Sequence, residues 1–193
     1  MNNLPILNCD FFREAKACYD PATVLGEEWN GTALDILDHP QITSEDKIWA
    51  ICAKGALPES VQSLMAVAFV RETPLHDGRN VADISTGERT VKALEVAELH
   101  ALGRATDGEL DAARGAARYS AWDASSAAAW DAAWAAARAA ARDAAVAAAW
   151  DAAWGADSAG AAAGDAAGDT SEAAAWDAQV EIARRVILLD HAE

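Results

Sequence analysis

The feature that most constrains the fold of this chain is a segment in which large side chains recur every four residues among alanines. Of the 67 residues from 112 to 178, 35 are alanine, the residue with the highest helix propensity. With the exception of Tyr119, the large side chains between 114 and 154 are separated by multiples of four: Arg114, Arg118, Trp122, Trp130, Trp134, Arg138, Arg142, Val146, Trp150 and Trp154. This pattern predicts a helical segment.

A four-residue repeat does not keep its side chains on one face of a straight α-helix. Each residue turns by about 100°, so each step of four advances by about 40°, and the stretch from Arg114 to Trp154 sweeps about 400°. The large side chains of one straight helix would therefore spiral around its whole surface. Two arrangements are consistent with the pattern: several helices of about 10–15 residues, or one long helix covered on several sides by other elements.

The first part of the chain has the signals of shorter helices. All five prolines lie in the first 74 residues. Thr43 or Ser44 is expected to cap a helix that includes Ile48 to Cys52, and apolar residues at helical spacing predict another helix over about 59–72 with one face in the core. For residues 1–40 we expect short helices and turns. Their packing anchors are expected to be aromatic: Phe11, Phe12, Tyr19 and Trp29.

Capping and turn signals place three further helix boundaries. A helix with Val91, Leu94, Leu99 and Leu102 on its inner face is expected to end at Gly103. The residues from Thr106 to Glu109 have the T-x-x-E form of a capping box, so a long helix is expected to begin near Asp107. A last helix from about Ser171 is expected to dock onto the rest of the protein through Trp176, Val180, Ala183 and Ile187.

These elements predict an all-α fold: an N-terminal bundle of short helices, an Ala/Trp-rich helical module and a closing C-terminal helix. The composition changes sharply near 105–111. We therefore predict an acidic helical N-terminal domain over 1–105 and an Ala/Trp-rich module over 106–193. The glycines within 155–169 are typical either of a flexible connector or of a G-x-x-x-G face for close helix contact.

The charge of the chain indicates the kind of partner. With 31 acidic and 15 basic residues the net charge is −16, and direct nucleic-acid binding is not expected because it requires a basic surface. A basic protein is the natural partner, and carboxylates could imitate phosphates in its nucleic-acid groove; a general solubilising charge is the alternative. The candidate partner-binding residues are Glu27, Glu28, Asp35, Asp38, Glu45, Asp46, Asp107 and Asp111.

The sequence contains no motif that points to an enzyme. It lacks H-E-x-x-H, a phosphate loop, a dinucleotide-binding glycine motif and a G-x-S-x-G elbow. Its three cysteines never form C-x-x-C, which indicates a reducing compartment rather than disulfides or a zinc site, and Cys52 is expected to be a buried structural thiol. We therefore predict no catalytic residues, no cofactor and no metal.

Two further features bear on location. No stretch of about 18–20 residues is rich in large apolar side chains, so no membrane span is expected. The first residues, M-N-N-L-P, lack the basic and apolar regions of a secretory signal. We predict a cytoplasmic protein of a bacterial cell.

The run from Lys92 to Leu110, followed by the A-A-R and A-A-W tetrads, resembles a family of alanine- and tryptophan-rich helical immunity proteins of bacteria and phages. The resemblance covers about 43–154, and its most specific part is the junction G-x-A-T-D-x-E-L over Gly103–Leu110. It implies a non-enzymatic all-α protein that blocks a toxin or effector by binding it. The phage members imply a counter-defence role, such as inhibition of a CRISPR nuclease complex. No site residue carries over from the family.

Charge and resemblance together predict an acidic inhibitor of the immunity or anti-defence type. It is expected to bind the basic surface of a nuclease, toxin or CRISPR complex and to block access of the substrate, with exposed aromatic side chains as the strongest contacts. The alternative is a structural or assembly protein, homo-oligomeric through its alanine and tryptophan faces.

Overall fold

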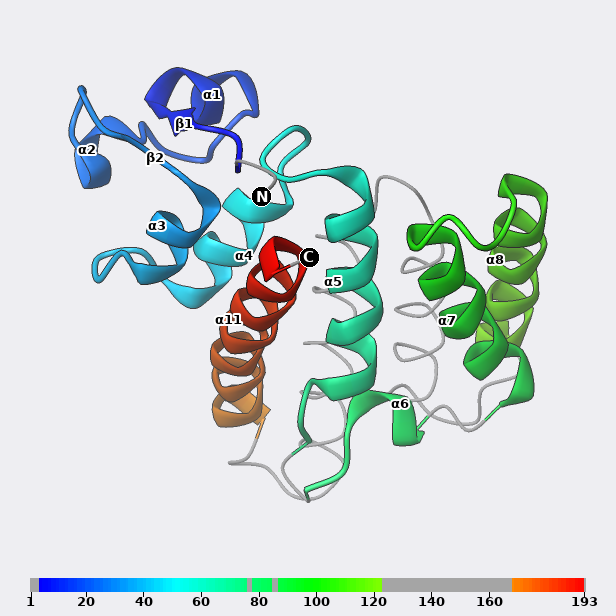
Figure 1. Ribbon diagram of the computed structural model, residues 1–193. Coiled ribbons are helices and arrows are strands. Elements are labelled where there is room, and N and C mark those ends of the chain that lie inside the picture. Colours follow the sequence, from blue (N-terminus) through cyan, green and yellow to red (C-terminus); the bar gives the residue numbers. More distant parts are fainter. Residues whose placement is uncertain (1–3, 76–77, 85–86, 123–167, 193) are drawn as a thin grey trace.

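A computed structural model describes residues 4–75, 78–84, 87–122 and 168–192, and in these ranges the chain is mostly helical (Figure 1). In chain order the elements are β1 (Leu7–Asn8), α1 (Cys9–Glu14), α2 (Ala22–Leu25), β2 (Asn30–Gly31), α3 (Ala33–Asp38), α4 (Ser44–Cys52), α5 (Glu59–Glu72), α6 (Val81–Ile84), α7 (Glu88–Ala101), α8 (Asp107–Trp122) and α11 (Gly168–Ala192). The prediction of an all-α fold is confirmed.

A short antiparallel strand pair ties the start of the chain to the segment before α3. Leu7 of β1 lies opposite Gly31 of β2, and the Leu7 side chain is buried. Asn8 then caps α1, because its side-chain oxygen accepts a hydrogen bond from the Phe11 N–H at 2.8 Å. A Cβ at Gly31 would lie 2.7 Å from a ring atom of Trp29, so a larger residue would displace its neighbours. Over the described residues up to 40, the expected short helices and turns are present.

Threonines start α3 and α4. The Asp35 carboxylate accepts a hydrogen bond from the Thr32 N–H at 2.6 Å, and the Thr32 hydroxyl accepts one from the Asp35 N–H at 3.5 Å, which completes a capping box. At α4, the Thr43 hydroxyl accepts a hydrogen bond from the Asp46 N–H at 3.2 Å. The helix predicted from Thr43 or Ser44 is therefore confirmed.

Helix α5 is the central helix of the described structure. Figure 1 shows it between α11 on one side and α7 on the other, and it has the bounds that the sequence predicts. The predicted apolar face is in the core, but burial extends beyond it, because buried side chains lie all round the helix: Val61, Gln62, Met65, Ala66, Val67, Ala68, Phe69 and Val70. Neighbours pack on several of its sides (α7, α11 and α6), so polar residues are confined to its ends and to a narrow strip.

The inner face of α7 differs from the predicted one. Of the four expected residues only Leu94 is buried, whereas Val91, Leu99 and Leu102 are 38–49% exposed. The buried face is built instead from smaller residues: Thr90, Ala93, Leu94, Val96 and Ala97. Alanines at this face let a neighbouring backbone approach closely. Among the described helices, α7 and α8 make the most extensive contact. Leucine positions therefore indicated the wrong side of the helix.

The turn into α8 agrees with the predicted capping box. The Glu109 carboxylate accepts a hydrogen bond from the Thr106 N–H at 2.8 Å, and the Thr106 hydroxyl accepts one from the Glu109 N–H at 3.3 Å. The helix begins at Asp107 and is described as far as Trp122. The tetrads after Trp122 and the glycine-containing stretch up to 167 lie outside the described residues.

Helix α11 closes the structure as predicted, although it begins at Gly168, three residues before the expected start. Its four predicted docking residues are all buried: Trp176, Val180, Ala183 and Ile187. The helix packs against α5, α4 and α3, elements from the first 72 residues. Helices on both sides of the predicted boundary at 105/106 thus contribute to one core, and the division into two domains stays a prediction.

Candidate functional site

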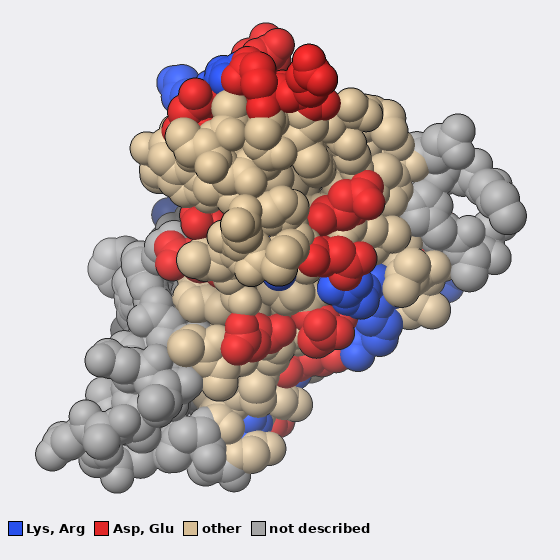
Figure 2. All heavy atoms as spheres, turned by 90° about the vertical axis from the view of Figure 1, so that its left-hand side faces the viewer, with Lys and Arg blue, Asp and Glu red and all other residues tan. Residues whose placement is uncertain are grey.

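Six of the eight acids singled out by the sequence lie in what we call the N-terminal part, residues 4–53, and two lie on α8. The N-terminal part carries nine acidic and three basic residues. Figure 2 shows acidic side chains gathered at the upper end of one face and recurring further down, where some border basic ones. Helix α8, which includes Asp107 and Asp111, lies on the opposite side of the described structure from α3 (Figure 1).

One arginine holds three of the N-terminal acids together. Arg13 forms ion pairs with Asp10 at 2.9 Å, with Asp20 at 2.9 Å and with Glu27 at 2.8 Å. The hydrogen bonds from Arg13 hold the pKa of the Glu27 carboxyl below its usual value. One positive charge against three carboxylates leaves a net charge of −2. The arrangement fixes these acids in place without neutralising them.

The other predicted acids have different local roles. Asp35 accepts hydrogen bonds from the N–H and hydroxyl of Thr32, and the backbone hydrogen bond in particular lowers its pKa. Ion pairs join Asp38 to Arg184 and Asp111 to Arg114, and an oxygen of the Asp107 carboxylate lies 2.9 Å from His100 Nε2. Glu28 and Glu45 are exposed on the surface of the N-terminal part. The eight acids therefore do not share one local role.

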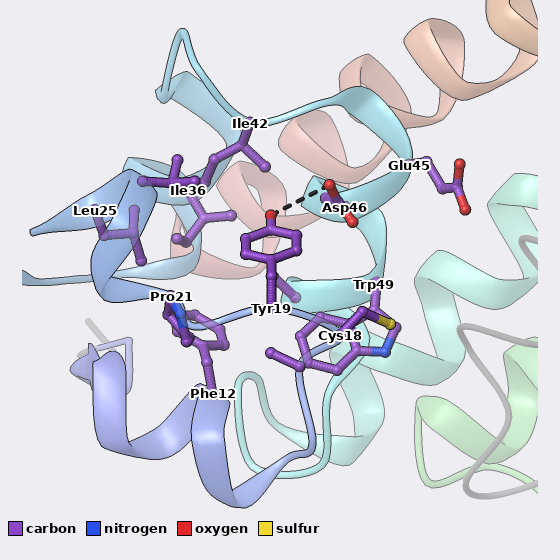
Figure 3. Close-up of a pocket in the computed structure, with 13 residues that line it drawn as sticks. Phe12, Cys18, Tyr19, Pro21, Leu25, Ile36, Ile42, Glu45, Asp46 and Trp49 are labelled. Atoms are coloured by element: carbon purple, nitrogen blue, oxygen red, sulfur yellow. Dashed lines mark hydrogen bonds between the residues drawn. The ribbon is translucent and has the colours of Figure 1, made fainter.

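The N-terminal part also encloses an apolar pocket that the sequence did not reveal. It has a volume of about 110 Å³ and lies between the segment after α1, the helices α2 and α3, and the first turns of α4 (Figure 3). Aliphatic side chains of Leu25, Ile36 and Ile42 form one wall, and the aromatic rings of Tyr19 and Trp49 lie across from them. The pocket is therefore suited to an apolar group.

Polar groups are few and lie at one edge of this pocket. The Tyr19 hydroxyl donates a hydrogen bond to the Asp46 carboxylate at 3.2 Å, and the Thr43 hydroxyl donates to the same oxygen at 3.0 Å. Tyr19 is 44% exposed. Partial burial, followed by the nearby Asp46 charge, raises the pKa of the Tyr19 hydroxyl. Tyr19 therefore stays protonated at neutral pH and acts as a donor that holds Asp46.

The three cysteines are all free thiols, and only one of them is exposed. Cys9 is buried and donates to the Gly26 carbonyl at 3.2 Å. Cys52 is also buried, as predicted, and burial raises the pKa of its thiol well above the usual value, which keeps it unreactive. Cys18 is exposed and lines the pocket next to Tyr19.

The described residues contain no group of three or more His, Cys, Asp and Glu side chains that could hold a metal ion. Of the histidines, His100 lies 2.9 Å from Asp107, and His39 accepts a hydrogen bond from the Gln41 N–H at 3.4 Å. Within the same ranges, no helix is both long and apolar enough to cross a membrane.

Sequence reasoning missed the pocket because it assigned Tyr19 to the core as a packing anchor. One signal was available in the sequence. The spacing T-x-x-D occurs at Thr32–Asp35 and again at Thr43–Asp46, and it marks both acids as capping residues rather than free surface charges. The exposure of Tyr19 and the opposing wall of the pocket depend on loops whose paths the sequence does not specify.

No protein-family model matches this chain, and comparisons with curated proteins and with solved structures gave no significant match.

Proposed function

We propose that this protein is a non-enzymatic acidic inhibitor that binds the basic surface of a nuclease, toxin or CRISPR complex and blocks access of its substrate. The observation that carries the proposal is the charge of the N-terminal part. Eight of its nine acidic side chains are exposed, against only three basic residues, in a chain with a net charge of −16. Such a surface attracts a cationic protein over several ångströms and speeds its association.

The Arg13 ion pairs suit this role because they fix the positions of three carboxylates before a partner arrives. Asp10, Asp20 and Glu27 come from α1, from the loop after it and from the loop after α2. Without Arg13 these acids would repel one another, and a partner would have to order them on binding. A preorganised acidic group lowers that cost.

The polar groups at the pocket favour binding over catalysis. Asp46 is engaged by the hydroxyls of Tyr19 and Thr43, and the raised pKa of Tyr19 makes it a poor base at neutral pH. The remaining lining is mainly aliphatic and aromatic. These features support an inhibitor that acts by occupying a surface.

The test is capture followed by reconstitution. The full chain is immobilised, proteins retained from a bacterial lysate at low salt are identified by mass spectrometry, and each is purified for pairwise binding. We expect a basic nucleic-acid-binding partner whose Kd rises about tenfold or more between 0.05 and 0.3 M NaCl, and from which the chain displaces labelled DNA or RNA. A Kd that does not change with salt, or a partner from which the chain does not displace the nucleic acid, would overturn the proposal.

A matched pair of variants locates the binding surface. Glu28→Gln/Glu45→Gln removes two exposed charges from the N-terminal part, whereas Glu59→Gln/Glu88→Gln removes two exposed charges elsewhere. The net charge is the same in both. We expect only the first variant to lower the affinity, and equal losses would show that total charge rather than this surface matters.

A self-associating assembly protein is the second candidate, and exposed leucines favour it. Leu188 and Leu189 near the end of α11 are 50% and 62% exposed, and Leu102 and Leu189 line the same groove. Large exposed apolar groups often mark contacts between proteins. Sedimentation equilibrium tests this candidate: a dimer that Leu189→Lys dissociates supports it, and a monomer at all concentrations removes it.

A further inference from the structure

We infer that the pocket bounded by Tyr19, Trp49 and Leu25 receives one apolar side chain of a basic partner, while Glu45 and Asp46 at its edge pair with a Lys or Arg beside that side chain. The inference rests on the proposed function and names the place and chemistry of the contact. Its occupant is a short cationic protein segment with a single apolar anchor.

The dimensions of the pocket favour a single side chain. Its volume of about 110 Å³ is somewhat smaller than the roughly 150 Å³ of an apolar cavity that holds benzene. A Leu, Ile or Met side chain matches this size. The walls come from four separate segments that pack around Phe12 and Ile36, both nearly fully buried, so the pocket is formed in the absence of an occupant. A preformed apolar recess is where anchor residues of protein interfaces insert.

The charges around the pocket select what can flank the anchor. Asp46 accepts hydrogen bonds from the hydroxyls of Tyr19 and Thr43, and neither hydroxyl carries a charge that would offset the carboxylate. Glu45 is exposed and also lines the pocket. Figure 3 shows the Asp46 carboxylate beside the Tyr19 hydroxyl, the Glu45 side chain on α4 directed away from Tyr19, and the side chains of Leu25, Ile36 and Ile42 on the other side of Tyr19. An apolar anchor next to a cation matches this layout, whereas an acidic neighbour would be repelled.

Exposed Cys18 provides a direct reporter of occupancy. It lines the pocket, and the other two cysteines are buried, so an alkylating reagent used without denaturant modifies Cys18 first. A side chain seated in the pocket should slow this modification.

The first experiment uses three blocked pentapeptides with the full-length chain: Lys-Arg-Leu-Arg-Lys, Lys-Arg-Ala-Arg-Lys and Glu-Glu-Leu-Glu-Glu. Binding is followed by NMR titration of backbone amides and by the rate of Cys18 alkylation. We expect the basic Leu peptide to bind about tenfold more tightly than the basic Ala peptide, to shift amides of residues 17–25 and 42–50, and to slow alkylation. The acidic Leu peptide should not bind measurably.

Two variants separate the apolar contact from the charged one. Val24→Phe fills the pocket and should reduce the affinity for the Leu peptide to that for the Ala peptide, with the Ala peptide unaffected. Glu45→Gln/Asp46→Asn should weaken both basic peptides by about threefold to tenfold at low salt, while Glu59→Gln/Glu88→Gln should not. The amide spectrum of each variant checks its fold, and the charge variant remains informative if Val24→Phe does not fold.

Several outcomes overturn the inference. Equal affinities for the Leu and Ala peptides exclude the anchor, equally tight binding of the acidic peptide excludes the charge selection, and concentration-dependent protection of Cys18 without peptide assigns the pocket to a second copy of the chain. The proposed function fails separately. If a reconstituted partner binds in a salt-dependent way but with the same affinity for Val24→Phe, the proposed function is supported and the pocket is excluded as its contact. If the peptides bind as expected but no basic partner is found, the pocket contact is supported and the proposed function is not.

Discussion

At the scale of single residues, buried polar contacts hold α11 to the end of α5. The Gln179 amide N–H donates a hydrogen bond to the Thr73 hydroxyl at 3.2 Å, and both residues are fully buried. Because water cannot reach this contact, losing one partner leaves the other without that hydrogen bond in an apolar environment. The contact therefore specifies how α11 sits as well as contributing to stability.

Replacing Thr73 by Val removes the acceptor with almost no change in shape. We expect the free energy of unfolding to fall by about 1–3 kcal/mol, because the buried Gln179 amide loses this partner. Chemical denaturation of the full chain measures the change. Thr73→Val/Gln179→Leu, which removes both polar partners, should recover part of the lost free energy of unfolding. If the double variant instead loses the sum of the two single-variant losses, the two residues are not coupled.

Stabilised carboxylates give the protein a predictable response to acid. Hydrogen bonds lower the pKa of Glu27, Asp35 and Glu109 in the folded chain relative to their ordinary values of 4.5, 3.8 and 4.5. Each carboxylate therefore stabilises the fold above its ordinary pKa and stops doing so as the pH falls through its folded value. We expect the melting temperature to be steady from pH 7 to 5 and to fall below about pH 4.5. Asp35→Asn/Glu109→Gln should flatten the decline, and an unchanged profile would contradict this assignment.

At the scale of elements, α7 shows how small residues can form the inner face of a helix. Leu94 is buried and Leu99, on the same helix, is 38% exposed. We expect Leu94→Ala to cost about 2–5 kcal/mol, because it opens a cavity in the core, and Leu99→Ala to cost about 1 kcal/mol or less. Thermal unfolding of the two variants compares the same chemical change at two positions. Similar losses of stability in the two variants would support the inner face that the leucine positions predict.

Local signals were predictable from the sequence, and contacts between distant segments were not. The Thr43 cap of α4, the bounds of α5 and the Thr106–Glu109 box depend on residues within one helical turn or on the spacing of large apolar side chains. The buried face of α7 depends on which neighbour packs closely, and alanine gives little sign of that. The pocket forms where four separate segments meet, and the sequence does not show that they meet. The sequence therefore predicts Tyr19 to be a core residue, although its side chain is exposed.

At the scale of the whole molecule, the net charge of −16 sets a balance between repulsion and ion pairing. Acids outnumber bases by about two to one, so most pairs of distant charges repel even though several arginines form ion pairs. We expect NaCl between 0.01 and 0.15 M to raise the melting temperature by about a few degrees, since salt screens this long-range repulsion. The effect should shrink at pH 4, where carboxylates begin to protonate. A falling melting temperature would show that ion pairs outweigh repulsion.

The position of α11 has a consequence for how the protein is made. Its buried face packs on α3, α4 and α5, which leave the ribosome long before α11 is synthesised. Until then the nascent chain carries an unsealed hydrophobic surface of isoleucine, valine and methionine side chains. Completion of the core must therefore wait until α11 has been translated, and during that interval the growing polypeptide presents a surface that chaperones recognise.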